Sequence, residues 1–444
     1  MPTVPITHSC FSRAVFRRLS GLSGNRFSPL LSLFLIAGFF FSPFSVVHAQ
    51  TEDQAPPVQV SSSIGDFEIE ELAVLEFPWG MALLPGDRML ITEKPGRLRI
   101  WAQGELSDPV EGVPEVVYRD APTEQGGLLD VALDPDFSDN NLVYISYVEA
   151  AEQQPSGMRD TGDARFADYV DKSDDIVRGG AVARGRLDGN RLQDLEVIWR
   201  QVPKTLGRGH FGHRLVFAPD GKLLITSGDR MRFDPAQSLT SNLGKVVRIN
   251  RDGSIPEDNP FVGQDDARDD IWSVGHRNML SAVMHPESEQ LWVFEMGPLG
   301  GDEVNLIEAG KNYGWPTVSN GSHYNRATIP PHQGTDEYTQ PVRTWTPVVS
   351  PSGAMVYDGE LIPEWQGNIL VGGLSSKALV RLVMDGERIA IEERLDMQRR
   401  IRDLTQAPDD TIFAIVDGEE GHLLRLVPMR TEPGRPIAVD ADMR

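Results

Sequence analysis

Short apolar runs separated by turn-forming residues recur along most of the chain. In each copy, a turn that contains Pro with an acidic residue or Gly leads into a short run rich in Leu, Val, Ile and Phe. Such runs are typical of β-strands, whereas few segments show the period of a long amphipathic helix. The pattern predicts an all-β fold. The six copies begin at Leu83, Leu133, Ala218, His285, Ile362 and Ala407.

The spacing of the copies predicts how the strands are arranged. They recur irregularly, roughly every 45 to 85 residues, a scale that favours radial repetition over a sandwich. We therefore predict a six-bladed β-propeller over residues 64–428, with each copy supplying two inner strands of one blade. A multi-sheet β protein without radial symmetry is the alternative. The polar segment 149–181 is expected to be an excursion on one rim, either facing the substrate or fully solvated.

The two ends of the chain differ in composition from this repeating part. Residues 1–49 combine four arginines and no acidic residue with an apolar run, and they end in "VHA", which is typical of a signal peptide. We expect cleavage after Ala49 and a periplasmic or secreted protein without membrane contact, the alternative being an uncleaved anchor. Residues 50–63 are expected to be a flexible start and residues 429–444 a tail.

Composition excludes several classes of function. The one cysteine, Cys10, lies in the predicted leader, so the mature chain would have neither a catalytic thiol nor a Cys-ligated metal. Loss of the four leader arginines takes the formal charge from −23 to −27. Such an acidic protein is unsuited to nucleic acid, whose phosphates require a basic face. An anionic ligand would need a local cluster of cations set against this overall charge.

Two histidines in the stretch "GRGHFGHRL" are the first candidates for chemistry. Zinc sites need three or four ligands, and residues three apart on a strand point to opposite faces, so His210 and His213 are not expected to share a metal. The neighbouring glycines argue against the helix of a metalloprotease motif. On these residues alone, His210 is either a general base or a structural histidine.

Two further stretches combine residues suited to ligand binding. In "GPLGGDE", Gly297 and Pro298 offer backbone carbonyls close to Asp302, a donor set that suits Ca²⁺, although an acidic turn would look the same. In "RRIRDL", Arg400 and Arg402 alternate around one residue and so point the same way along a strand. Like charges on one face repel, so we expect an anionic ligand or a carboxylate between them.

Taken in order, several stretches resemble the soluble PQQ-dependent sugar dehydrogenases, the glucose, aldose and sorbosone dehydrogenase family. The resemblance covers roughly residues 65–428 and agrees with the propeller prediction, because the family has six blades. No single stretch would establish it, but the ordered set is specific. The stretches are "FPWGMALLPG", "EQGGLLDVALDPDF", "GHFGHRLVFAPDGKLLITSGD", "LGKVVRINRDGSIPEDNPF", "GHRN", "EMGPLGGDEVN", "NYGWP" and "RIRDL".

The resemblance implies a role for each matched residue. His210 stands where the family has its catalytic base, which takes the proton of the anomeric hydroxyl while a hydride passes to the quinone. Gly297 and Pro298 stand where backbone carbonyls hold the active-site Ca²⁺, and Asp302 would support their loop. The cofactors implied are PQQ and Ca²⁺, the substrate is a small-molecule sugar, and an external electron acceptor is required. The residues expected at the cofactor are Gln125, Arg277, Asn278, Arg400 and Arg402.

Two departures from the family pattern bear on specificity. Gly209 replaces an acid that precedes the base in the glucose type, and Ser375 replaces a cofactor-contacting lysine. Lys377, two residues further on, would lie on the same face of a strand and could substitute for that lysine. Two other functions stay open at this point, a calcium-dependent propeller lactonase and a binding propeller without catalysis. His213 receives no role.

Overall fold

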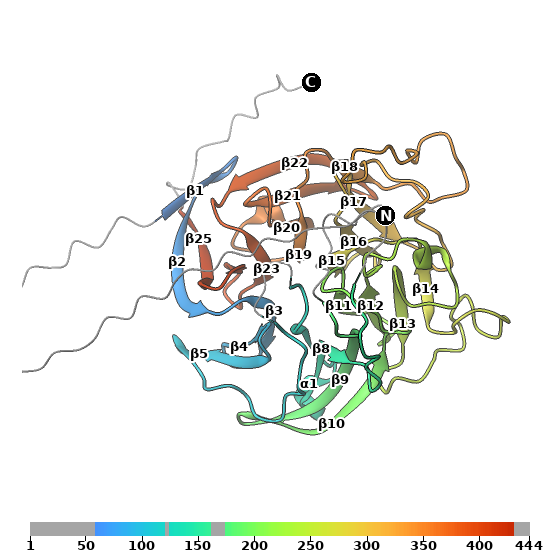
Figure 1. Cartoon of the computed structure of the whole chain (residues 1–444). Helices are drawn as coiled ribbons and strands as arrows, with labels where there is room; N and C mark the ends of the chain where they lie inside the picture. Colours follow the sequence, from blue (N-terminus) through green and yellow to red (C-terminus); the bar gives the residue numbers. More distant parts are fainter. Residues whose placement is uncertain (1–57, 120–123, 161–173, 430–444) are drawn as a thin grey trace, which may run out of the picture. The chain divides into compact units, whose positions relative to one another are not determined.

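The computed structural model describes residues 58–119, 124–160 and 174–429. The predicted leader, its cleavage point and residues 430–444 of the predicted tail lie outside the described residues. Within them, strands form six antiparallel sheets (Figure 1), which confirms the all-β class. None of the described helices is long and apolar enough to cross a membrane.

Three sheets come from the first half of the described chain. The first contains β3 (Pro78–Leu84), β4 (Arg88–Glu93), β5 (Arg97–Ala102) and β6 (Glu105–Leu106). The second contains β7 (Leu128–Leu133), β8 (Leu142–Ala150), β9 (Arg178–Asp188) and β10 (Arg191–Arg200), with the short helix α1 (Phe137–Asn140) between β7 and β8. The third contains β11 (Gly212–Phe217), β12 (Leu223–Ser227), β13 (Lys245–Ile249) and β14 (Ile271–Val274), with a 3₁₀ turn at Asp234–Gln237.

The other three sheets complete the set. The fourth contains β15 (Met279–Met284), β16 (Leu291–Glu295), β17 (Asp302–Ile307) and β18 (Arg343–Trp345). The fifth contains β19 (Pro351–Tyr357), β20 (Asn368–Gly373), β21 (Ala378–Asp385) and β22 (Arg388–Asp396), with a 3₁₀ turn at Pro363–Trp365. The sixth contains β23 (Ile401–Gln406), β24 (Ile412–Val416), β25 (Gly421–Met429), β2 (Gly65–Leu75) and β1 (Val58–Ser62).

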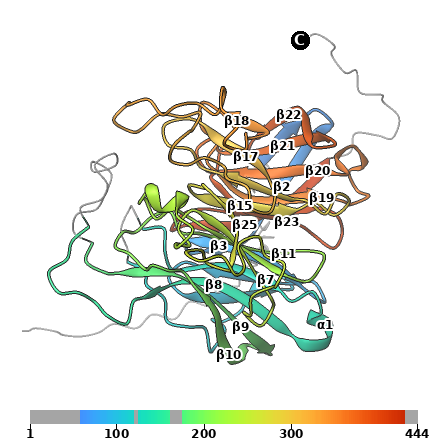
Figure 2. The same ribbon diagram turned by 90° about the vertical axis from the view of Figure 1, so that its right-hand side faces the viewer.

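The first strand of each sheet lies at the centre of the propeller. Strands β3, β7, β11, β15, β19 and β23 each contact the first strand of both neighbouring sheets, so that they close a ring (Figure 1, Figure 2). The six-bladed β-propeller is thereby confirmed. In every blade, the turn signal of the sequence repeat joins the first strand to the second, which is why the copies recur although the outer loops differ in length.

The sixth blade joins the two ends of the described chain. Strand β2 pairs with β25, where Glu68 lies opposite Val427, and β1 forms the outer edge next to β2. The prediction of a flexible start at residues 50–63 is therefore wrong for Val58–Ser62. A polar edge strand needs few apolar residues because one of its faces meets water, and Val60 anchors β1 in the core.

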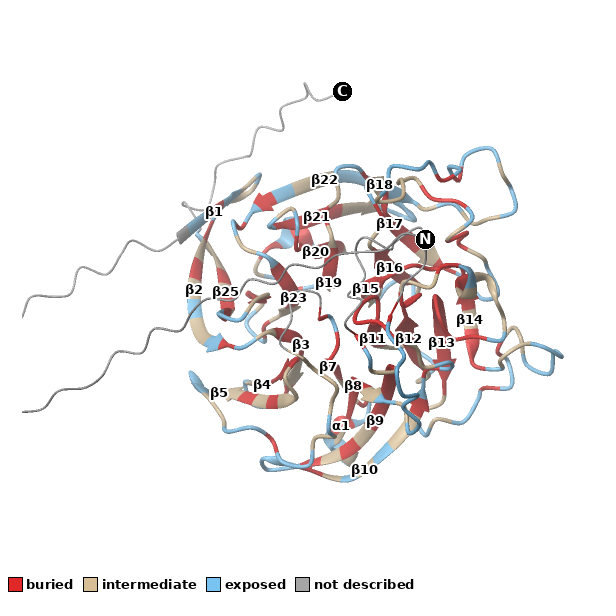
Figure 3. Cartoon of the chain, in the orientation of Figure 1, coloured by how far each residue is buried: buried red, intermediate tan, exposed pale blue. Residues whose placement is uncertain are grey.

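The hydrophobic core is divided among the interfaces between neighbouring blades. Six clusters of buried side chains each join two adjacent sheets, and the strands that carry them are mostly buried (Figure 3). One residue from each interface, taken around the ring from the first blade, is Tyr147, Trp199, Val246, Trp292, Trp365 and Phe413. The blades are thus fixed against one another by packing, and the loops at the ends of the inner strands can hold a site rigidly.

A buried arginine on one inner strand crosses the central channel and contacts the other five inner strands. Arg214 on β11 forms ion pairs with Asp130 on β7 at 3.1 Å and with Asp403 on β23 at 3.2 Å. Its remaining donors bind the backbone carbonyls of β15, β19 and β23, and its guanidinium lies 4.2 Å from the centre of the Trp79 ring on β3. One of these carbonyls belongs to Arg402, so the channel ion pairs also fix a predicted cofactor residue.

Two glycines leave room for the channel carboxylates. A Cβ atom at Gly80 would lie 2.6 Å from the Asp130 carboxylate, and one at Gly353 would lie 2.1 Å from the Asp403 carboxylate. Burial raises the pKa of Asp130 to about 6 and also raises the pKa of Asp403, while Arg214 opposes both shifts. The channel is therefore closed by a tightly packed ionic cluster, with the predicted site at one end of it.

Candidate active site

His210 forms a pair with a carboxylate from the next strand of the same blade. Its Nδ1 lies 2.7 Å from Oδ1 of Asp229, and the indole N–H of Trp315 donates to the other oxygen of Asp229 at 2.8 Å. Burial and the nearby Arg277 lower the pKa of His210, although Asp229 opposes them. A neutral imidazole whose Nδ1–H is bound by a carboxylate presents Nε2 as a proton acceptor, which is the state a general base requires.

The loop that carries His210 is held by its backbone. His210 itself has a left-handed conformation with φ of 51°, and its N–H donates to the side-chain oxygen of Gln125 at 2.9 Å. The N–H of Gln125 donates in return to the carbonyl of Arg208. The side chain of Arg230 donates to the carbonyls of Gly207 and Gly209. The base is thus held by hydrogen bonds to its own backbone and to the backbone of residues 207–209.

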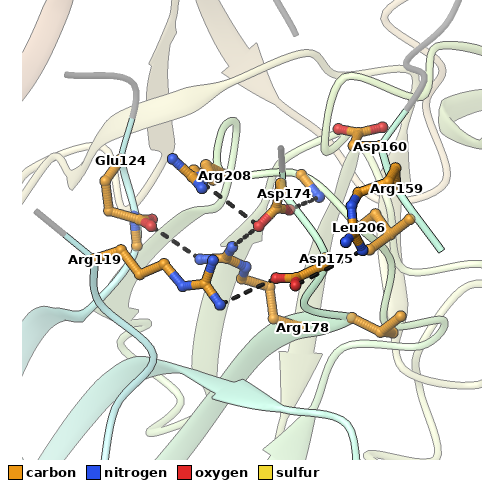
Figure 4. A network of polar contacts seen from close by, with 12 residues as sticks. Arg119, Glu124, Arg159, Asp160, Asp174, Asp175, Arg178, Leu206 and Arg208 are labelled. Carbon is orange, nitrogen blue, oxygen red and sulfur yellow. Dashed lines mark hydrogen bonds and ion pairs between the residues drawn. The ribbon is translucent and has the colours of Figure 1, made fainter. Parts of the chain in front are cut away.

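A buried ionic network supports this loop (Figure 4). Arg178 forms ion pairs with Glu124 at 2.9 Å and with Asp174, and Asp174 also accepts a hydrogen bond of 2.7 Å from the N–H of Gly207. Residues 161–173, the middle of the predicted excursion, lie outside the described residues. At its described end, the side chains of Asp174 and Arg178 are fully buried beside the loop of His210, whereas Asp175 between them is exposed.

A cavity of about 270 Å³ opens next to this loop at the end of the channel. Gln125 lines it, as do Arg400 and Arg402, and both arginines bind Asp417. Arg400 lies 2.9 Å from one oxygen of that carboxylate and Arg402 lies 2.7 Å from the other. Of the two alternatives predicted between the arginines, an anionic ligand or a carboxylate, the structure shows the carboxylate. The remaining lining residues are Trp79, Lys94, Glu124, Phe211, Gly212, Leu280, Met296, Ser350, Leu374 and Ser375.

Arg277 and Asn278 lie beside this cavity, at the start of the fourth blade. Arg277 donates to the carbonyls of Met296 and Gly297, both at 2.7 Å, and its guanidinium lies 5.3 Å from the centre of the Trp315 ring. The amide of Asn278 contacts the sulfur of Met296. Met296 lines both the large cavity and a small adjoining one next to Arg277. The predicted cofactor residues Gln125, Arg400 and Arg402 thus line the large cavity and Arg277 lines the small one. His210 and Asn278 line neither cavity, but each contacts a lining residue, Gln125 and Met296 respectively.

The predicted calcium loop is well ordered by its own carboxylate. One oxygen of Asp302 accepts a hydrogen bond from Gly297 N–H at 2.8 Å, and the other accepts from Val349 at 2.8 Å and Ser350 at 2.6 Å. Asp302 therefore supports the loop, as expected, and its oxygens are already engaged. Among the described residues, no group of three or more His, Cys, Asp or Glu side chains is placed to hold a metal. The Gly297 carbonyl of this loop already accepts a hydrogen bond from Arg277 at 2.7 Å. A carbonyl oxygen has a second lone pair, so a hard cation could still use it, with further oxygens from a bound ligand.

The structure does not bring Lys377 to the cavity. Lys377 is exposed and is not among the lining residues, whereas Ser375 lines the cavity and bonds to the hydroxyl of Ser350. A different lysine, Lys94, lines the cavity between the first and sixth blades. Next to the base, the space at Gly209 is filled by Met231, whose methyl group would lie 2.2 Å from a Cβ atom there.

His213 is separated from His210 by the strand itself and points into the interface with the second blade. Its Nδ1 donates to the carbonyl of Phe211, and burial lowers its pKa to about 4. Nε2 lies against Gly180, where a Cβ atom would come within 1.4 Å. His213 thus fills space in the core between the second and third blades.

The matching family model covers most of the propeller. The model described as "Glucose / Sorbosone dehydrogenase" matches residues 75–425. The chain belongs to the glucose/sorbosone dehydrogenase family. Within this family, the aldose sugar dehydrogenase YliI of Escherichia coli is 37% identical over 362 residues, which are 80% of this chain and 91% of the relative.

Two further glucose/sorbosone dehydrogenase relatives resemble this chain, one in sequence and one in structure. Quinoprotein glucose dehydrogenase B of Acinetobacter calcoaceticus is 27% identical over 438 aligned residues, covering 79% of this chain and 85% of the relative. The crystal structure of the soluble aldose sugar dehydrogenase of Escherichia coli in the apo-form has a TM-score of 0.73 at 36% identity. It covers 82% of this chain and 100% of that structure.

Sequence reasoning missed three residues of the glucose/sorbosone dehydrogenase site. Asp229 follows β12 in "ITSGDR", Asp417 follows β24 in "AIVDGE", and Lys94 follows β4 in "ITEKPG". Each stands directly after the second strand of its blade, at the same end of the propeller. That shared position is a signal the sequence contains, because the second strands of all blades run in the same direction and end on one face.

Proposed function

We propose that the protein is a PQQ- and calcium-dependent dehydrogenase that oxidises the anomeric hydroxyl of aldose sugars to lactones. The observation that carries this proposal is the position of the His210–Asp229 pair, beside a cavity lined by Arg400 and Arg402. Two relatives support it by name, one an aldose sugar dehydrogenase and the other a quinoprotein glucose dehydrogenase. The family also supports the coarser statement that the protein is a sugar dehydrogenase.

His210 would act as the general base. Its lowered pKa keeps the imidazole neutral at neutral pH, so Nε2 can take the proton of the sugar hydroxyl. Asp229 binds Nδ1–H, orients the ring and stabilises the imidazolium that forms. When bound, PQQ would supply the acceptor for the hydride that leaves the anomeric carbon. The sugar becomes a lactone once it has lost this hydride and the hydroxyl proton.

The cavity fits a polycarboxylate cofactor better than a neutral ligand. Arg400 and Arg402 both line the cavity and share the carboxylate of Asp417. Guanidinium groups bind carboxylates in a forked geometry. Gln125, Arg277 and Asn278 would complete the cofactor contacts around the adjoining space. The carbonyls of Gly297 and Pro298 would hold Ca²⁺ on their loop, where the ion would polarise a cofactor oxygen.

A lactonase and a binding propeller remain the competing functions. A calcium-dependent lactonase would surround its ion with carboxylate and Asn side chains, whereas the loop of the described residues offers carbonyls and a carboxylate that is bonded to backbone N–H groups. A binding propeller would have no use for a histidine oriented by a carboxylate. We propose a periplasmic or secreted location, with an external electron acceptor that reoxidises the cofactor.

The experiment uses the chain without residues 1–49, supplied with PQQ and Ca²⁺, and follows dye reduction with a panel of aldoses. We expect turnover only when both additions are present, and loss of turnover on addition of EDTA. His210→Ala should remove turnover while PQQ still binds. His422→Ala, which changes a partly exposed histidine paired with Glu71, is the matched control and should keep full activity. Sugar-lactone hydrolysis that ignores PQQ, or full activity of His210→Ala, would overturn the proposal.

A further inference from the structure

Lys94 is fixed by its backbone between two blades at the cavity. Its N–H donates to the carbonyl of Phe77 at 3.0 Å, and its carbonyl accepts from Leu128 at 3.0 Å. Gly127 allows this close approach, since a Cβ atom there would lie 2.0 Å from the Lys94 carbonyl. Leu128 begins the inner strand of the second blade, so the position of Lys94 is set by the packing of the first blade on the second.

The side chain of Lys94 is a buried cation without an acceptor. It is 8% exposed and lines the cavity, and it forms no hydrogen bond or ion pair with any residue that the structure describes. Its ammonium lies 5.0 Å from the centre of the Phe77 ring, which attracts a cation but accepts no hydrogen bond of ordinary strength. A buried ammonium without a partner is costly, and proteins keep one where a ligand completes it.

The charges around Lys94 call for an anion. Three cations, Lys94, Arg400 and Arg402, line the cavity with two carboxylates, and one of these, Glu124, is already paired with buried Arg178. Burial and Arg402 lower the pKa of Lys94 to about 8, against the opposing effect of Asp417. The cavity is therefore positively charged in a protein that is acidic overall.

We propose that Lys94 binds a carboxylate of the cavity's ligand and is the third cation, with Arg400 and Arg402, of a polycarboxylate-binding site. It supplies, from the end of β4, the positive charge that Lys377 does not bring to the cavity. The identity of the ligand as PQQ rests on the proposed function, whereas the role of Lys94 toward a polycarboxylate does not. Lys94 is a binding residue in this proposal and takes no part in proton transfer.

The test compares two probes with the chain lacking residues 1–49. One is PQQ with Ca²⁺, and the other is trimesate, an aromatic tricarboxylate without redox chemistry. Binding is measured by calorimetry and by the rise in the thermal unfolding midpoint, neither of which requires turnover. Lys94→Met should weaken both probes about 10- to 100-fold, the usual loss for a charge-assisted hydrogen bond, and Lys94→Arg should restore most of the affinity. Lys377→Met is the matched control and should bind as the native protein does.

The unliganded protein separates a binding role from a structural one. Because Lys94 lacks an acceptor, Lys94→Met should unfold at the same temperature as the native protein, or higher, and should lose only the ligand-induced rise. Binding of trimesate but not PQQ would overturn the proposed function and leave the role of Lys94 supported. Native affinity in Lys94→Met, a native protein that binds neither probe, or a loss seen equally in Lys377→Met would overturn the role of Lys94.

Discussion

The carboxylate of Asp229 binds Nδ1 of His210 at 2.7 Å and is itself held by Trp315, so the imidazole has one orientation and one tautomer. Asp229→Asn should therefore lower kcat about 10²- to 10⁴-fold, because the amide neither fixes that tautomer nor stabilises the imidazolium. The measurement is steady-state dye reduction with saturating PQQ. An unchanged affinity for PQQ would show that the loss lies in the proton transfer, and an unchanged kcat would contradict the role of Asp229.

The pH profile follows from the direction of the His210 shift. Burial and Arg277 place the pKa of His210 below its ordinary value of about 6.5, so kcat/KM should rise with pH through a midpoint below 6.5 and then stay level. Asp229 raises this pKa, so Asp229→Asn should move the midpoint to still lower pH. A midpoint above 6.5 in the native enzyme would show that another group limits the rate.

A second pH effect concerns ligand binding at Lys94. Its pKa of about 8 in the empty cavity means that an anion binds with full affinity below pH 8 and loses up to about tenfold per pH unit above it. The charged groups that act on Lys94 are Arg402, Asp417, Glu124 and Arg400, and the pKa of Asp417 is lowered despite burial, chiefly by Arg402. Trimesate titrations between pH 7 and 9.5 should show this decline, and Lys94→Arg should abolish it.

The contact between His213 and Gly180 predicts a large loss of stability. Gly180→Ala places a methyl group on the imidazole and should cost about 3 kcal/mol of unfolding free energy, measured by urea denaturation. His213→Ala in the same chain removes the clash, so the double variant should lose less unfolding free energy than the two single variants lose together. Gly185→Ala on the same strand, whose nearest contacts are 3.2 Å, is the control and should cost less than about 1 kcal/mol.

The channel ion pairs predict a loss of stability that depends on pH. Arg214→Met leaves Asp130 and Asp403 buried without a counterion and should cost about 3 to 5 kcal/mol at pH 7. Burial raises the pKa of Asp130 to about 6 while Arg214 opposes that rise, so this pKa should be higher still in the variant. The folded variant then takes up more protons than the folded native protein as pH falls from 7 to 5, and its deficit should shrink. Urea denaturation at pH 7 and pH 5 measures this. Arg251→Met, at a partly exposed ion pair, should cost less than about 1 kcal/mol.

The propeller could be predicted because its signals are local. The turn between the first and second strands of each blade is encoded by adjacent residues, so all six turns stood out before the pairing of strands was known. Strand β1 was missed because an edge strand is specified by its partner β2 and shows little apolar alternation of its own. The loops between β8 and β9 and between β17 and β18 set the irregular spacing, and their residues follow no periodic pattern.

The relation between site residues could be predicted where those residues are close together on one strand. Arg400 and Arg402 point the same way because they are two residues apart, and the carboxylate expected between them exists. Its identity as Asp417 depends on the pairing of β23 with β24, and the presence of Lys94 depends on how neighbouring blades pack together. The periodicity of the sequence cannot predict such contacts, because they join residues far apart in the chain. What these residues share is that their strands end on the same face of the propeller.

The pairing of β2 with β25 has a consequence for the order in which the protein matures. A ribosome makes β2 well before β25, so the sixth blade cannot form until β25 has emerged. Until then β2 lacks its pairing partner and the inner ring stays open between β23 and β3. Closure of the propeller is therefore a late step that joins segments far apart in the sequence.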